Sequence, residues 1–194
     1  YTRDINYLRD TAYPLMKGAC DFMLEWLIED PHNPAQLITA PCTSPEADYI
    51  TDKGYRGSSL YGGTADLAII RELFKNTIKG AQALGIDKNY QVRLQSSLER
   101  LRPYHIGKRG NLMEWYHDWD DQDWHHRHQS HLLGLYPFHQ ISLAQTPDLA
   151  QAATKTLEIK GDKSTGWSTG WRINLWARLH RQDKAYQILR KLLT

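Results

Sequence analysis

Few aliphatic side chains occur between residues 111 and 131, and this limits where that segment can lie in a folded domain. Tryptophans, carboxylates, imidazoles and the guanidinium of Arg127 alternate along it until an apolar run begins at Leu132. A packed interior would leave many of these polar groups without hydrogen-bond partners, which costs free energy. We therefore expect the segment to line a polar, concave surface bordered by tryptophans.

Apolar residues recur at helical spacing along most of the remaining chain. The expected helices span residues 10–29, 64–84, 90–101, 128–136, 146–158, 168–180 and 183–193. Thr64 is a suitable cap for the second helix and Gly85 a suitable stop. In the first helix, the recurring apolar positions are Leu15, Ala19, Phe22, Trp26 and Leu27. The proline-rich residues 30–63 predict a long loop, with a short hairpin as an option, and no strand pattern longer than four residues stands out.

Short turns and long polar loops alternate between the expected helices. If the helices pair antiparallel around a ring, the long loops gather on one face and form a cleft there, while the short turns close the other end. A length of 194 residues is within the range of one ordinary domain. The sequence therefore predicts a single all-α domain over residues 1–194, with a toroidal arrangement of helices and long loops on one face.

The overall charge and composition limit the classes of molecule that we expect the protein to bind. The formal net charge is +2, and no basic stripe is present that could follow a phosphate backbone, so we expect no nucleic-acid partner. No apolar run approaches the roughly 20 residues of a membrane span, and we expect no membrane partner. Cys20 and Cys42 are too few for a disulfide framework or a zinc cluster. Seven Trp and eleven Tyr beside three Phe favour aromatic rings with a polar edge, which suits carbohydrate stacking as well as an ordinary core.

Glu46 is a candidate proton donor. It follows Pro45, and Pro41 lies a few residues before it, so the backbone around the carboxyl is stiff. Cleavage of a glycosidic bond requires a carboxylic acid held in a partly desolvated cleft, where it protonates a poor leaving group. From spacing alone, a solvated loop glutamate or a helix-capping acid remains an open alternative.

The histidines near Arg127 allow three interpretations: a metal site, satisfied structural histidines, or contacts to a ligand rich in hydroxyl groups. On a helix only His128 and His131 would share a face, and the common two-histidine zinc motif has a different spacing. The nearby aspartates lack the order of a calcium-binding loop. We therefore expect neither a metal nor a cofactor and favour ligand contacts. Trp167, flanked by Gly166 and loop residues, is a candidate for stacking on a sugar, with a core position as the alternative.

Several blocks of sequence, in order along nearly the whole chain, resemble glycoside hydrolase family 95, the inverting α-L-fucosidases and related α-L-galactosidases. The blocks are Thr-Ser-Pro-Glu at 43–46, Met-Glu-Trp at 113–115, His-Arg-His-Gln-Ser-His-Leu-Leu-Gly-Leu-Tyr-Pro at 126–137, Gly-Asp-Lys-Ser-Thr-Gly-Trp-Ser at 161–168, and Asn-Leu-Trp-Ala-Arg-Leu at 174–179. Agreement among separate blocks is more specific than any one of them.

The resemblance implies an (α/α)6 barrel, present here as a partial barrel, and removal of a terminal α-linked L-fucose or L-galactose with inversion. Glu46 matches the general acid of the family, and Arg127 and His128 match positions that contact the terminal sugar. We also expect Glu114 and Trp167, from the matching blocks, to contact substrate. The substrate would be an oligosaccharide or glycoconjugate. The resemblance alone suggests a secreted or periplasmic enzyme.

Two features of the family are missing from the 194 residues. Members activate water with asparagines in an Asn-x-Asn pair upstream of the Ser-Pro-Glu block, supported by an aspartate in a downstream Asp-Gly-Asn-Phe block, and neither the pair nor the block occurs here. We therefore expect the chain to be the middle of a catalytic domain that is inactive in isolation. Two alternatives remain: a lyase of the helical-toroid type, with His128 or a tyrosine abstracting a proton, and an inactive carbohydrate-binding fragment.

Overall fold

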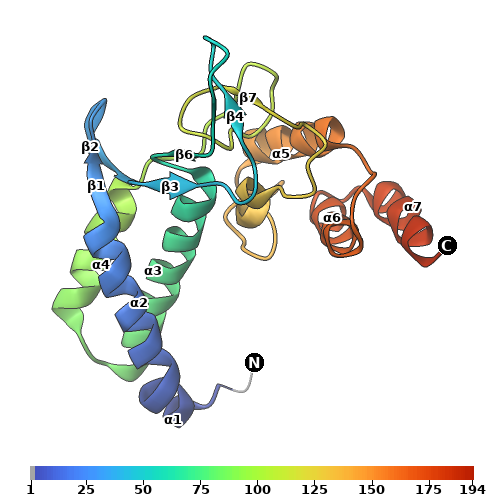
Figure 1. Cartoon of the computed structure of the whole chain (residues 1–194). Coiled ribbons are helices and arrows are strands. Elements are labelled where there is room, and N and C mark those ends of the chain that lie inside the picture. The colour runs from blue at the N-terminus through green and yellow to red at the C-terminus, as the bar shows by residue number, and fades with distance from the viewer. Residues whose placement is uncertain (1–2) are drawn as a thin grey trace. The chain divides into compact units, whose positions relative to one another are not determined.

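The computed structural model describes residues 3–194 and groups them into two compact units (Figure 1). Of these residues, the first unit comprises 3–40 and Ile69–Arg102, and the second comprises Pro41–Ala68 and Pro103–Thr194. Helices make up most of the regular structure, as expected, and short strands occur in both units. The single domain over residues 1–194 stays a prediction, and each unit is described by itself.

A continuous helical stretch opens the first unit. It consists of α1 (Ile5–Tyr7), a π-helical turn η1 (Leu8–Ala12) and α2 (Tyr13–Trp26). Tyr13 and Cys20 are buried, whereas Leu15 and Phe22 are 70% and 61% exposed. The apolar spacing correctly predicted a helix here, and some of these apolar side chains lie on the exposed side of α2.

A β-hairpin follows α2 directly. Strand β1 (Leu27–Asp30) pairs antiparallel with β2 (Asn33–Thr39), and Asp30 accepts a 2.9 Å hydrogen bond from the backbone N–H of His32 in the turn. The first helix was expected to continue to residue 29, but it ends at Trp26 because the next four residues donate and accept hydrogen bonds across the hairpin. The all-α prediction is thus incorrect in this part.

Two helices complete the first unit. The bounds of α3 (Thr64–Leu84) are those expected from the sequence, and its first five residues belong to the second unit. Gly85 ends it at φ 70°, in the left-handed region that glycine adopts without strain. Helix α4 (Lys88–Arg100) follows, and Leu101 then bridges to Leu37 of β2.

Two small sheets in the second unit connect segments that are distant in sequence. Strand β3 (Cys42–Thr43) pairs with β6 (Ser59–Leu60), and β4 (Tyr49–Ile50) lies between β5 (Arg56–Gly57) and β7 (Asp120–Asp121). Tyr49 pairs with Asp121, and its ring packs against Trp115 and Trp119 at centroid distances of 5.2 and 4.8 Å. This pairing fixes the loop that carries Glu46 beside the polar segment 111–131.

The remaining elements of the second unit are helical: η2 (Ser130–Gly134), α5 (Pro147–Lys160), α6 (Gly166–Arg178) and α7 (Gln182–Leu193). The helix expected over 128–136 is a shorter 3₁₀ helix. The main core of this unit consists of Leu112, Leu132, Leu135, Ile141, Ala150, Ala152, Ala153, Leu157, Leu175, Trp176, Leu179 and Ile188. Across residues 3–194, no helix has both the length and the apolar character required to cross a membrane.

Candidate active site

Glu46 lies at the tip of a four-residue turn. The backbone N–H of Ala47 donates a 2.8 Å hydrogen bond to the carbonyl of Ser44 and closes the turn. Pro45 occupies the second position, where its fixed φ favours such turns. Ser44 and Ala47 are 3% and 7% exposed, whereas the side chain of Glu46 is 59% exposed. The turn is therefore anchored at both ends and presents a carboxyl at its tip.

Arg127 and His128 both reach this carboxyl. The guanidinium of Arg127 forms an ion pair with Oε2 of Glu46, and Nε2 of His128 lies 3.6 Å from the same oxygen. Nδ1 of His128 lies 2.8 Å from the carbonyl oxygen of Pro45. Two acceptors at this distance would repel each other, so Nδ1 carries a proton and donates it to the carbonyl. His128 thus holds the turn and faces the Glu46 carboxyl with its other nitrogen.

Trp167 lies beside His128, at the edge of this group of residues. It stands in the first turn of α6 and is 55% exposed. Its ring lies 5.1 Å from the ring of His128, nearly edge-on at 83°. An exposed indole beside a guanidinium and an imidazole provides an apolar face next to directed hydrogen-bond donors. Four of the five residues expected at the site, Glu46, Arg127, His128 and Trp167, are therefore brought together.

The Arg127–His128 backbone is held from α6. Ser168 Oγ donates a 2.6 Å hydrogen bond to the carbonyl of Arg127. The fully buried Arg172 donates to the carbonyl of Gly161 and, at 3.5 Å, to that of His126. Burial lowers the pKa of Arg172, and nearby Asp162 opposes this shift. Ser168 and Arg172 were not expected at the site, and they fix the loop that carries Arg127.

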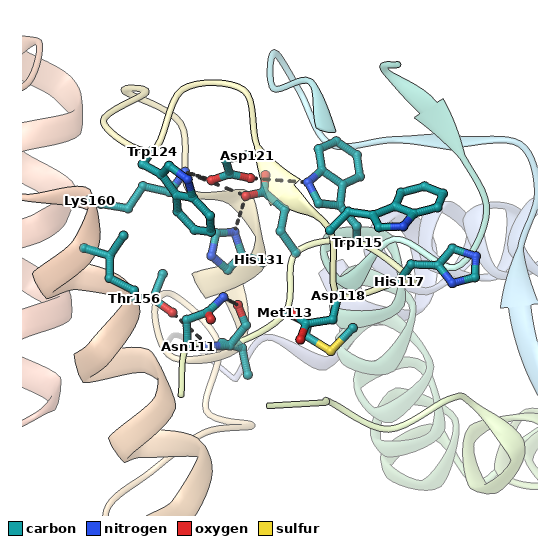
Figure 2. A pocket seen from close by; sticks show the side chains of 14 residues that line it. Asn111, Met113, Trp115, His117, Asp118, Asp121, Trp124, His131, Thr156 and Lys160 are labelled. Carbon is teal, nitrogen blue, oxygen red and sulfur yellow. Dashed lines mark hydrogen bonds and ion pairs between the residues drawn. The ribbon is translucent and has the colours of Figure 1, made fainter. Parts of the chain in front are cut away.

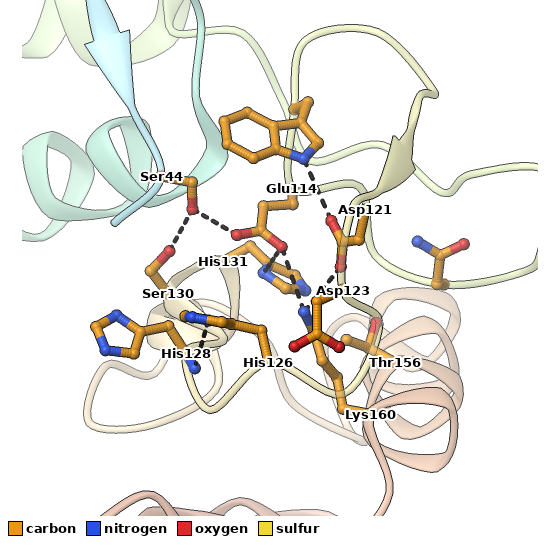
Figure 3. Close-up of polar contacts among 12 residues, drawn as sticks. Ser44, Glu114, Asp121, Asp123, His126, His128, Ser130, His131, Thr156 and Lys160 are labelled. Carbon is orange, nitrogen blue, oxygen red and sulfur yellow. Dashed lines mark hydrogen bonds and ion pairs between the residues drawn. The ribbon is translucent and has the colours of Figure 1, made fainter. Parts of the chain in front are cut away.

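Glu114 has a different environment from the one expected. It is only 5% exposed, and its carboxylate contacts other side chains (Figure 3). Ser44 Oγ donates to Oε1 at 2.5 Å, and Nδ1 of His131 and Nζ of Lys160 lie 3.1 and 3.8 Å from Oε2. We therefore separate Glu114 from the exposed group around Glu46.

Asp121 extends these contacts into a buried charge network, which we define as Glu114, Asp121, His131 and Lys160. Nζ of Lys160 lies 2.8 Å from Oδ2 of Asp121, and Trp115 Nε1 donates to Oδ1 at 3.3 Å. Burial acts to raise the pKa of Glu114, but the basic groups of His131 and Lys160 and the Ser44 hydrogen bond hold this pKa below its usual range. Burial and the charge of Glu114 raise the pKa of Asp121.

Two hollows lie beside these residues in the second unit. The first adjoins the buried charge network, includes Trp115, Trp124 and Lys160 in its lining, and has a volume of about 10 Å³ (Figure 2). That volume corresponds to about one water molecule and excludes a sugar. The second, of about 640 Å³, opens beside Arg127 and His126. Burial lowers the pKa of His126, and the adjacent basic side chains act in the same direction. The larger hollow has room for a sugar residue.

The described part of the chain contains no cluster of side chains suited to binding a metal ion. Among residues 3–194, no three His, Cys, Asp or Glu side chains gather in a way that could hold a metal ion. The imidazoles of His126 and His128 lie 5.1 Å apart between ring centroids, and His128 points its nitrogens at Pro45 and Glu46 instead.

The sequence interpretation missed Ser44 and Lys160 as parts of the site. A signal for Lys160 was present, because Ala153, Leu157 and Lys160 recur at spacings of four and three on one face of α5. A lysine that continues a buried stripe indicates a buried ion pair. Ser44 precedes Pro45, but nothing in its spacing identifies Glu114 as its partner.

Comparisons with known proteins identify relatives of the whole chain. The model of the family described as "Glycosyl hydrolase family 95 catalytic domain" matches residues 1–194. Alpha-L-fucosidase 2 of Arabidopsis thaliana is 38% identical over 190 residues, which cover 97% of this chain and 22% of that protein. Probable alpha-fucosidase A of Aspergillus niger is 34% identical, covering 97% of this chain and 24% of that protein. The protein of the same name from Aspergillus oryzae is 30% identical, covering 93% and 25% respectively. The chain thus spans about a quarter of the length of these relatives.

Proposed function

The chain belongs to glycosyl hydrolase family 95, and from this membership we propose that it is part of an enzyme that hydrolyses terminal α-linked L-fucose, or the closely similar L-galactose, with inversion. Its substrate would be an oligosaccharide or glycoconjugate. The names of the relatives support fucose as the sugar. The observation that carries the proposal is the convergence of Arg127 and His128 on the exposed carboxyl of Glu46.

We propose that Glu46 donates a proton to the glycosidic oxygen as the bond to the sugar breaks. The stiff turn suits this role, because a proton donor must be held within hydrogen-bond reach of the leaving oxygen. Proton donation requires the neutral carboxyl, whereas Arg127 forms an ion pair with the carboxylate. The sugar must therefore draw the guanidinium away, and its adjacent hydroxyl groups are suitable acceptors for the paired N–H groups.

His128 and Trp167 would complete the sugar-binding part of the site. The imidazole offers one directed hydrogen bond, and the exposed indole offers a flat apolar surface for a sugar face. The larger hollow beside Arg127 has room for the part of the glycan beyond the cleaved bond. Neither role requires a metal or a cofactor.

Inversion also requires a group that activates water on the opposite side of the sugar. That group must stand roughly 6.5 to 9.5 Å from the proton donor. We propose that it comes from other parts of the polypeptide, which complete an (α/α)6 barrel, and that residues 1–194 alone turn over no substrate.

Product analysis tests the proposal. The intact enzyme is incubated with an α-fucosylated oligosaccharide, and the first sugar released is followed by NMR. Inversion predicts that β-L-fucose appears first and then equilibrates with the α anomer. Initial release of α-L-fucose would contradict inversion. An unsaturated product that absorbs in the near ultraviolet would indicate a lyase, and binding without any product would indicate an inactive carbohydrate-binding protein.

A further inference from the structure

The hydroxyl of Ser44 connects the Glu46 turn to the buried charge network. Its oxygen lies 2.5 Å from Oε1 of Glu114 and 2.6 Å from Oγ of Ser130. The low pKa of Glu114 keeps this carboxylate ionised, so it can only accept a hydrogen bond. Ser44 has one hydroxyl proton and gives it to Glu114, and Ser130 must therefore donate to Ser44. The direction of both hydrogen bonds is fixed by the charge of Glu114.

The position of Ser44 determines where Glu46 points. Ser44 is the first residue of the turn, and its carbonyl accepts the hydrogen bond from Ala47 that closes it. The ring of Pro45 removes one of the few backbone rotations between Ser44 and the carboxyl. A shift of Ser44 is therefore transmitted to Glu46, because little backbone freedom remains to absorb it.

The buried charge network holds the turn from both sides. Glu114 binds Ser44 at the start of the turn, while Asp121 lies in β7, whose partner β4 begins three residues after Glu46. Lys160 lies close to both carboxylates, and His131 contacts Glu114. None of the four residues of the network is more than 7% exposed, so the network is shielded from solvent. Rearrangement is restrained, because moving one charge leaves another buried without a partner.

We propose that Glu114 is a positioning residue for the proton donor: through the hydroxyl of Ser44, the buried charge network fixes the Glu46 carboxyl at the distance that proton transfer requires. This inference rests on the proposed function. It assigns to Glu114 a role in the reaction without contact to the substrate. Misplacement of a reacting group by about 1 Å can cost on the order of 100-fold in rate.

The test compares two substrates of the intact enzyme that differ in their need for a proton. An α-L-fucoside of 2-chloro-4-nitrophenol has a good leaving group, and a fucosylated oligosaccharide has a poor one. The variant Ser44→Ala removes the hydroxyl that links the turn to Glu114 and accepts from Ser130. We expect kcat to fall about 10- to 100-fold on the oligosaccharide and only a few-fold on the aryl fucoside. Inhibition by free L-fucose should not change, because Arg127 and His128 remain.

Two further variants separate positioning from folding. Thr77→Val removes the hydroxyl of another fully buried residue, Thr77, which belongs to the other compact unit. Thr77→Val should lower the melting temperature without changing the ratio of kcat on the oligosaccharide to kcat on the aryl fucoside. Glu114→Gln keeps an oxygen that can accept from Ser44 but removes the charge. It should lower the melting temperature more than Ser44→Ala does, while changing the ratio of the rates less.

Three results would overturn the inference. Equal losses on the two substrates for Ser44→Ala would mean that the hydroxyl affects only the amount of folded enzyme. Unchanged rates would mean that the Glu46 turn keeps its position without Glu114. Failure of the unmodified enzyme to hydrolyse either fucoside would remove the proposed function itself, and this outcome is distinguishable because it does not depend on any variant.

Discussion

Replacing Lys160 with methionine removes the cation that two buried carboxylates share. Lys160 is 2% exposed, and its Nζ lies 2.8 Å from Asp121 and 3.8 Å from Glu114. Methionine keeps the apolar stem, so the change removes mainly the charge. Removing one partner of a buried ion pair costs about 3–5 kcal/mol, because the other charge stays buried. We expect a loss of this size in the free energy of unfolding at pH 8.

The loss in the free energy of unfolding caused by Lys160→Met should be smaller at lower pH. Burial and Glu114 already raise the pKa of Asp121, and removing Lys160 raises it further. A carboxyl whose pKa is higher in the folded state binds a proton on folding, so the variant gains stability as the pH falls through that pKa. Protonation removes the uncompensated charge. The difference from the unmodified protein should therefore become smaller as the pH is lowered from 8 through the raised pKa of Asp121.

Urea unfolding, followed by the fluorescence of buried tryptophans such as Trp115 and Trp176, measures these differences. The double variant Lys160→Met/Asp121→Asn removes the cation and one of the stranded charges together. It should recover about 1 kcal/mol or more of the loss, within the range of coupling between residues in contact. A loss below about 1 kcal/mol for Lys160→Met, or simple addition of the two single effects, would refute the reasoning.

Three more predictions concern single residues. Arg127→Lys should raise KM for a fucosyl substrate about tenfold or more, because lysine lacks the paired donors of the guanidinium; an unchanged KM in steady-state kinetics would exclude this contact. The lowered pKa of Glu114 implies that this residue stabilises the fold fully above about pH 4.5 and loses that contribution as the pH falls toward about 2. Glu114→Gln should flatten the stability profile in this range, as measured by urea unfolding. Gly134→Ala should cost about 1–3 kcal/mol in unfolding experiments, because the added methyl would collide with the hydroxyl and ring of Tyr104; a neutral effect would contradict the packing.

The sequence predicts helices well where the end signals are local. Both ends of α3 agree with expectation, since Gly85 allows the left-handed backbone that stops it. The first helix was predicted too long because Leu27 and Ile28 extend the apolar pattern, whereas hydrogen bonds to β2 decide that they form a strand. Periodicity detects an amphipathic helix without identifying which side is covered, and Leu15 is exposed although it belongs to the apolar pattern.

The candidate site was predictable in its exposed part. The prolines around Glu46 made it a candidate, and the family resemblance supplied its expected role and that of Arg127. Their convergence depends on the pairing of β4 with β7, two-residue strands that are too short to give a sequence pattern. Segment 111–131 was expected to be a surface throughout, but Glu114 and Asp121 are buried, because Lys160 pairs with both carboxylates from a position distant in the sequence.

The role of Glu46 as proton donor is tested most directly by the variant Glu46→Gln of the intact enzyme. Its rates are measured on a series of aryl α-L-fucosides whose leaving groups differ in acidity, together with a fucosylated oligosaccharide. A proton donor predicts that kcat falls about 10²- to 10⁴-fold on the poorest leaving groups and progressively less as the leaving group becomes more acidic. The same loss across the whole series would contradict proton donation by Glu46.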